Sequence, residues 1–260
     1  MAHAAESAHW YTRSGEVAYT VTAKDGNQRP TTLRDARKLS LVPSVTTIIR
    51  CAAAPGLEYW KVQQAIMAAL TLPKVDGESE EAYLSRILSD SKEQARKAAE
   101  RGTAIHAAVQ GHYEGEPPSE EFFPHVQAAD KALYEWTQWK EWRAEESFAH
   151  PLGFGGKVDL RATSLFLADA KTKEFDEAGA KTLKTWDEHA MQLAAYRHGL
   201  GMDKARCAIV YVSTTTPGLA KLIEIPEEEL QKGWKCFYSL LHFWQAKNNY
   251  TSAFEKELAA

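Results

Sequence analysis

The sequence predicts a mixed α/β fold, in which helices flank a central mixed sheet. Short apolar or alternating segments predict its strands, and longer segments rich in helix-forming residues predict the helices around them. Strands are expected over 155–160, 165–173, 207–212 and 219–225, and helices over 56–70, 92–113, 186–198 and from Pro226 onward. A length of 260 residues with 44% hydrophobic and 25% charged side chains is typical of one elaborated globular domain.

The two central strands carry acidic and basic residues at positions that bring them together. Side chains alternate along a strand, so Asp169 and Lys171 share one side, while Ala170 turns the other way and leaves its carbonyl near the edge of the site. The connection 161–164 is short enough for a hairpin, which sets Asp159 against Asp169 across an antiparallel pair. Two acids and one cation are therefore expected in one small volume.

The apolar run Leu165–Ala168 indicates that the second of these strands is buried on both faces. Charged groups that end a buried strand need partners or a metal ion. Two carboxylates and a carbonyl suit Mg²⁺ or Mn²⁺, which lowers the pKa of bound water and neutralises phosphoryl charge. Lys171 is then placed to orient the water or to stabilise the pentacovalent phosphorus. The alternative is that Asp169 and Lys171 are solvated residues at a sheet edge.

A single histidine stands out on the expected helix over 92–113. Gly102 interrupts this helix one turn before His106 and on the same side, at a cost of about 1 kcal/mol relative to alanine. Close approach of another segment or of a ligand explains such a glycine. Taken alone, a histidine on a helix is more often packed or solvated than a metal ligand.

Five segments, in this order, resemble the PD-(D/E)XK nuclease superfamily and, within it, the RecB-type exonucleases. That group includes phage-encoded members and the mitochondrial genome maintenance exonuclease. The segments are Pro43–Ile49, Arg101–His106, Glu145–Asp159, Asp169–Thr172 and Gln192–Tyr196, and the resemblance covers roughly residues 42 to 200. Val158 stands where the family name has proline, a departure that RecB-type members often share.

The resemblance implies a restriction-endonuclease-like core and a site for one or two Mg²⁺ or Mn²⁺ ions. Its implied ligands are His106, Asp159, Asp169, the backbone carbonyl of Ala170 and Glu145. Lys171 is the implied catalytic lysine, with Asp159 and Asp169 as its catalytic partners. Glu146 competes with Glu145 for the same place. Histidine is a mild argument for manganese, because Mg²⁺ prefers oxygen ligands.

The resemblance also implies contacts to DNA. Gln192 and Tyr196 lie four residues apart on one face of the expected helix, and in RecB-type enzymes the matching pair approaches the DNA or the active-site lysine. Burial in the core is the expected role of Trp60, and stacking on an unpaired base is the alternative that makes it a candidate DNA contact. A local basic track is expected near the central strands, formed by Lys157, Arg161, Lys171, Lys173, Lys181, Lys184 and Arg197.

Composition limits the cofactors and the surroundings of the protein. A net charge of −4 argues against tight, nonspecific coating of duplex DNA. Cys51, Cys207 and Cys236 lack the spacing of a disulfide framework or a zinc site, and they are one short of the four that hold an iron–sulfur cluster in some RecB-type relatives. No cluster and no membrane partner are expected, and the cytosol of a bacterium or of a phage-infected host is the expected location.

We therefore expect one nuclease domain with three parts: an amino-terminal β-hairpin extension (1–41), a helical portion that supplies His106 (42–142), and a catalytic sheet core with a carboxy-terminal helix (143–260). By resemblance it is a metal-dependent DNA exonuclease that acts on free, single-stranded ends in recombination, replication or DNA degradation. A structure-selective endonuclease and a non-catalytic DNA-binding protein of the same fold are the alternatives.

Overall fold

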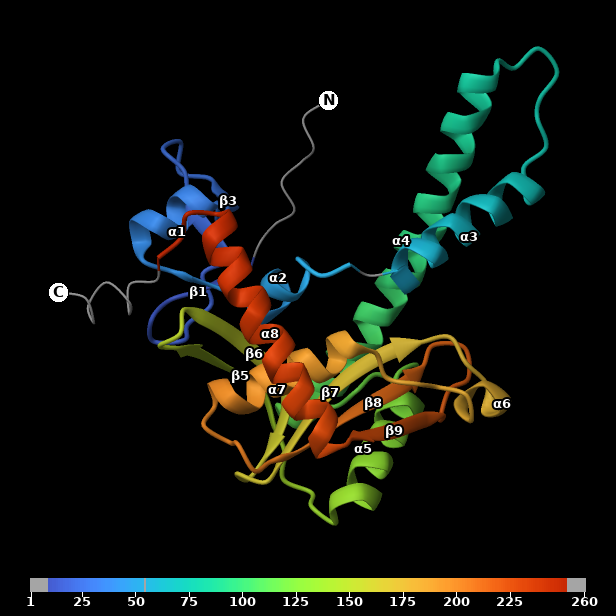
Figure 1. The fold of residues 1–260 in the computed structure, drawn as a ribbon. Coiled ribbons are helices and arrows are strands. Elements are labelled where there is room, and N and C mark those ends of the chain that lie inside the picture. Colours follow the sequence, from blue (N-terminus) through green and yellow to red (C-terminus); the bar gives the residue numbers. More distant parts are fainter. Residues whose placement is uncertain (1–8, 54, 252–260) are drawn as a thin grey trace.

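A five-stranded sheet forms the centre of the computed structural model, which describes residues 9–53 and 55–251 (Figure 1). Its strands lie side by side in chain order: β5 (Arg143–His150), β6 (Phe154–Ala162), β7 (Phe166–Lys173), β8 (Arg206–Ser213) and β9 (Ala220–Ile225). Only β7 and β8 run parallel; the other three pairings are antiparallel. The predicted mixed α/β fold is confirmed, and β5 adds a strand to the four that the sequence predicted.

Helices cover both faces of this sheet. The crossover from β7 to β8 contains α6 (Glu177–Ala180) and α7 (Asp187–Gly199), and α8 (Glu227–Lys247) packs on α7. The opposite face is covered by α5 (Phe123–Thr137) and the second half of α4 (Glu80–Tyr113).

Alternation along the central strands divides the core between the two helical layers. In β8, Ile209 and Tyr211 pack in the cluster with α7, while Val210 and Val212 pack with α4 and α5. In β7 the residues from Leu167 to Ala170 are buried, as expected for a strand covered on both faces. Leu165 differs from the expected pattern, because it lies in the turn before β7 and is 55% exposed.

The first half of α4 and helix α3 (Pro55–Thr71) form a two-helix arm that projects away from the sheet (Figure 1). Helix α4 begins twelve residues before the expected start at residue 92, with Ser79 as its N-cap. Large apolar side chains on α3 remain exposed, namely Tyr59, Val62, Ile66, Met67 and Leu70. Within the described residues, no helix combines the length and the apolarity that crossing a bilayer requires.

The amino-terminal segment joins the core as well as forming a hairpin. Strands β2 (Thr20–Thr22) and β3 (Gln28–Pro30) form the hairpin around Gly26, followed by α1 (Leu33–Leu39). Strand β1 (Trp10–Tyr11) instead pairs with β4 (Val42–Pro43), just before the short helix α2 (Val45–Ile49). Trp10 and Tyr11 are 1% and 2% exposed, so this part is built into the core rather than peripheral.

Candidate active site

The candidate site lies where β6 and β7 separate. Their antiparallel ladder pairs Ala162 with Phe166 and ends at Leu160 opposite Ala168, so Asp159 and Asp169 are the next residues in register. Beyond this point the backbone N–H of Ala170 donates to Oδ2 of Asp159 at 2.9 Å instead of continuing the ladder. The predicted placement of the two acids opposite each other follows from this register.

Helix α4 brings His106 to the same point. Its Nε2 lies 3.0 Å from Oδ2 of Asp159, across 53 residues of sequence. Gly102, one turn earlier, packs against β7, because a Cβ atom at this position would lie 2.5 Å from Oγ1 of Thr172. The predicted close approach at Gly102 is therefore to Thr172, the residue after Lys171.

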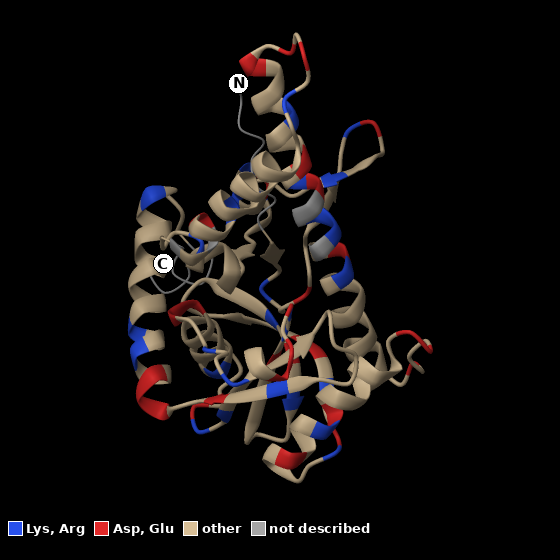
Figure 2. Cartoon of the chain, turned by 90° about the vertical axis from the view of Figure 1, so that its right-hand side faces the viewer, with Lys and Arg blue, Asp and Glu red and all other residues tan. Residues whose placement is uncertain are grey.

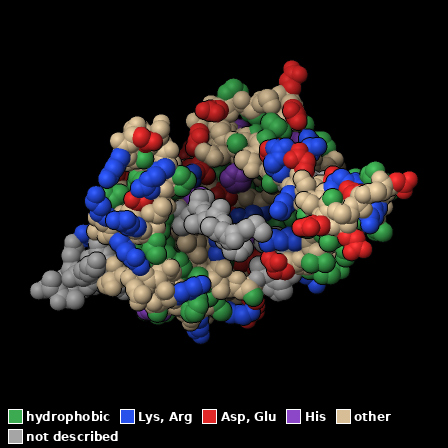
Figure 3. All heavy atoms as spheres, turned by 90° about the horizontal axis from the view of Figure 1, so that it is seen from above, with side chains coloured by type: hydrophobic (Ala, Val, Ile, Leu, Met, Phe, Trp, Pro, Cys, Tyr) green, Lys and Arg blue, Asp and Glu red, His purple; other side chains and the backbone are tan. Residues whose placement is uncertain are grey.

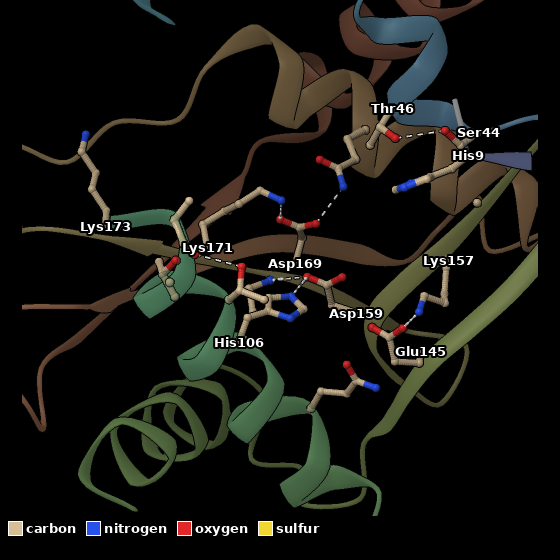
Figure 4. A pocket seen from close by; sticks show the side chains of 18 of the residues that line it. His9, Ser44, Thr46, His106, Glu145, Lys157, Asp159, Asp169, Lys171 and Lys173 are labelled. Carbon is tan, nitrogen blue, oxygen red and sulfur yellow. Dashed lines mark hydrogen bonds and ion pairs between the residues drawn. The ribbon is translucent and has the colours of Figure 1, made fainter. Parts of the chain in front are cut away.

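Helix α7, which covers the face of the sheet opposite α4, contacts the second acid, Asp169. Asp169 is fully buried, and its Oδ1 accepts a hydrogen bond from Nε2 of Gln192 at 2.8 Å. Its Oδ2 forms an ion pair with Nζ of Lys171 at 2.6 Å and has no hydrogen-bond partner beyond that pair in the described part of the chain. Nε2 of Gln192 is also 3.0 Å from the hydroxyl of Tyr196. Figure 4 shows the acids, His106 and Lys171 converging.

The two carboxyl groups differ in their ionisation. Burial, together with the nearby charge of Asp159, raises the pKa of Asp169 to about 6, although Lys171 opposes this. Burial also acts to raise the pKa of Asp159, but the hydrogen bond from His106, the charge of Lys171 and the Ala170 N–H together lower it. The pKa of His106 is raised by its hydrogen bond with Asp159. Despite burial, the pKa of Lys171 is raised by both acids.

Glu145 lies on the edge of this cluster. The pairs Ala144–Leu160 and Glu146–Val158 place Glu145 opposite Asp159, and its φ of 59° is left-handed, which costs of order 1–3 kcal/mol for a residue other than glycine. Glu145 lines the cavity and forms an ion pair with Lys157. Glu146 instead pairs with Arg161 at 2.6 Å and does not line the cavity, so Glu145 is the acid that faces the site.

A cavity of about 1320 Å³ surrounds these residues. This volume exceeds the roughly 300–1,000 Å³ of sites for small molecules and suits a segment of a polymer. Seen from above, the molecule is hollowed near its centre, with histidine, acidic and basic side chains at the rim (Figure 3). Of the predicted DNA-contacting residues, Lys157, Lys173, Gln192, Tyr196 and Trp60 all line the cavity. Trp60 is 38% exposed and is therefore not a core residue.

The predicted basic track is only partly present. Of its seven members, Lys157, Lys171 and Lys173 line the cavity, where Arg50 joins them. Arg161 is tied to Glu146, and Arg197 is 8% exposed and paired with Glu227, so the prediction is wrong for these two. Four cationic side chains of the lining face four acidic ones, namely Glu145, Asp159, Asp169 and Glu174. Lys, Arg, Asp and Glu are likewise interspersed over the molecule in Figure 2.

The donor set suits a hard divalent cation. Two carboxylates, one imidazole and the carbonyl of Ala170 are ligands that Mg²⁺ or Mn²⁺ accepts, and the buried Oδ2 of Asp169 is held by its ion pair with Lys171. In the described residues, no three His, Cys, Asp or Glu side chains are arranged as a ready-made coordination site. Lys171 and His106 instead occupy one oxygen of each acid.

No pattern in the sequence predicted that several residues of the cavity wall would lie there. His9 and Tyr19 come from the amino-terminal segment, and Arg50 follows α2, yet all three line the same cavity as Asp169. The periodicity and turn patterns that predict elements carry no information about such distant contacts. The Pro43–Ile49 segment was the only indication that this region reaches the site.

The chain is similar to solved exonuclease structures only at low sequence identity. No model of a known protein family matches the chain, and no curated protein matches it. Among solved structures, a provisionally named exonuclease from Eubacterium rectale has a TM-score of 0.42 and 12% identity, over 58% of this chain and 69% of that chain. An alkaline exonuclease from Laribacter hongkongensis has a TM-score of 0.35 and 16% identity, over 78% of this chain and 98% of that chain. Likenesses at these scores carry no argument about function.

Proposed function

We propose that this chain is a metal-dependent DNA exonuclease of the PD-(D/E)XK type. One observation supports this most strongly: Asp159, Asp169 and Lys171 converge at the fork between β6 and β7, inside a large cavity, with His106 against Asp159. Burial of acids and a lysine together is costly for stability, so such a cluster is typical of a functional site.

In this proposal Asp159, Asp169 and the carbonyl of Ala170 would hold Mg²⁺ or Mn²⁺, with His106 as a further ligand and Glu145 at the edge. An ion held there would lower the pKa of the attacking water and neutralise the charge that grows on the phosphoryl oxygens. Lys171 moves its ammonium from Asp169 to the water or to the phosphate. Gln192 keeps the Asp169 carboxylate oriented, and Tyr196, which is 4% exposed, in turn positions Gln192.

DNA with free, single-stranded ends is the proposed substrate. Helices α3 and α4, the amino-terminal segment and the sheet all contribute to the cavity wall, which favours an unpaired strand over a duplex. The nearly balanced charge of the lining gives little attraction for phosphate until a divalent cation is bound. The proposed roles are recombination, replication or DNA degradation.

Lys171→Ala tests the proposal. Cleavage of end-labelled single-stranded DNA in Mg²⁺ or Mn²⁺ should fall at least a hundredfold, while binding in Ca²⁺ should change less than threefold. Asp169→Asn should lower both cleavage and metal affinity. Lys173→Ala, two residues further along the same strand, is the matched control and should retain cleavage within about tenfold. Wild-type cleavage rates for Lys171→Ala would contradict the proposed mechanism.

A further inference from the structure

An aromatic pair stands in the wall of the cavity at the amino-terminal segment. The rings of His9 and Tyr19 are stacked, with centroids 4.3 Å apart and planes 19° from parallel. Both residues line the same cavity as Asp159 and Asp169, and both are half-buried. In Figure 4, His9 lies on one side of the two acids and Lys173 on the other.

This pair is held in place before any ligand binds. The hydroxyl of Tyr19 is 2.7 Å from that of Tyr11, whose side chain is buried. The carbonyl of His9 accepts from the backbone N–H of Ser44 at 2.9 Å, and the carbonyl of Tyr19 accepts from that of Thr31 at 2.9 Å. A rigid aromatic surface loses little conformational freedom when a flat ligand stacks on it.

The surroundings of the pair suit a nucleotide. Arg50 and Lys157 are close enough to His9 to act on it electrostatically, and both line the cavity. Burial, Arg50 and Lys157 all lower the pKa of His9, which favours the neutral form of its ring. A neutral imidazole presents an uncharged π-face, and the Arg50 guanidinium lines the same cavity.

We propose that His9 and Tyr19 form a stacking platform for one unpaired nucleobase of the strand whose phosphodiester lies at Asp159 and Asp169. The proposal rests on the proposed nuclease function and names the part of the substrate that this wall recognises. A base inside a duplex has both faces covered by its neighbours, so the platform selects single-stranded DNA near the cleavage point. Stacking on an aromatic side chain changes affinity by about 5- to 150-fold per base.

Fluorescence of 2-aminopurine tests the platform. Single-stranded oligonucleotides with 2-aminopurine at successive positions from each end are bound to the full chain in Ca²⁺. We expect quenching to be strongest at one position, to be lost in His9→Ala and to persist in His9→Phe, which keeps the stacking surface. His242→Ala is the matched control, because His242 contacts Tyr238 on α8, a helix that contributes no residue to the cavity.

An abasic substitution at the quenched position provides a double-mutant cycle. The abasic substitution should weaken binding by the wild-type chain at least fivefold, and binding by the His9→Ala variant less than twofold. Equal losses in the two proteins, or quenching that His9→Ala leaves unchanged, overturn the platform. If the wild-type chain cleaves DNA and needs Lys171 to do so, but His9 and the removed base show no coupling, only the stacking proposal is refuted. If it neither binds nor cleaves DNA, the nuclease proposal fails with it.

Discussion

At the scale of single residues, Gly102 sets how closely helix α4 approaches strand β7. The absence of a side chain lets α4 approach Thr172 on β7, and this approach sets the 3.0 Å contact between His106 and Asp159 one turn later. Alanine is intrinsically better than glycine in a helix interior by about 1 kcal/mol. The contact with Thr172 decides whether alanine stabilises or destabilises the fold, because a Cβ at 2.5 Å from Oγ1 requires the Thr172 side chain or one of the two elements to shift.

Gly102→Ala is therefore expected to destabilise the protein by about 1–3 kcal/mol and to lower cleavage at least tenfold. Thermal unfolding and the rate of DNA cleavage measure the two effects. Thr172→Ala in the same chain should restore most of both, since it removes Oγ1.

Gly111→Ala is the matched control on the same helix. Its Cβ would approach Oε2 of Glu116 at 3.2 Å, a mobile side-chain end, so a gain of up to about 1 kcal/mol is expected. Equal effects of the two substitutions would show that Thr172 does not constrain Gly102.

At the scale of elements, a buried arginine joins the end of α7 to the start of α8. Arg197 donates to Oε2 and Oε1 of Glu227 at 2.6 and 3.1 Å, and to the carbonyl of Ala205 at 3.3 Å. Because α7 also carries Gln192, this joint helps to hold the helix that orients Asp169. Hydrogen bonds from Arg197 lower the pKa of Glu227 to about 2.

Glu227→Gln is expected to lower the free energy of unfolding by about 1 kcal/mol at pH 7. The folded-state pKa lies below the value of about 4.3 in the unfolded chain. The ionised pair therefore stabilises the fold above pH 4.3, and this contribution is lost as the pH falls toward 2. Unfolding midpoints of wild type and variant should converge over that range. Glu228→Gln, in the same helical turn without the Arg197 contact, should change stability by less than half as much.

At the scale of the whole molecule, the cavity is lined by segments that are far apart in sequence. The arm contributes Trp60 and Gln64, the sheet-packed half of α4 contributes His106, the amino-terminal segment contributes His9, and the sheet contributes the acids. The proposed exonuclease function predicts that a strand enters this cavity by its end rather than in its middle.

Covalently closed single-stranded circles test this threading. Linear end-labelled DNA of the same sequence should be degraded at least a hundredfold faster than the closed circles, and circles opened by a single cut should behave as linear DNA. Destruction of closed circles at the linear rate would identify the protein as an endonuclease, the runner-up function.

The sequence by itself determined the elements and the central pair of acids. Alternation, apolar runs and one short turn predicted β6, β7, β8, β9 and α7, and they predicted Asp159 opposite Asp169 with Lys171 on the same side. These features could be predicted because they depend on contacts between residues close in sequence. Only the tertiary structure decided which layers meet. It brought His106 from α4 and Gln192 from α7 to the two acids, distinguished Glu145 from Glu146 and placed His9 in the cavity wall. Packing of distant elements fixes those contacts, and no local pattern encodes it.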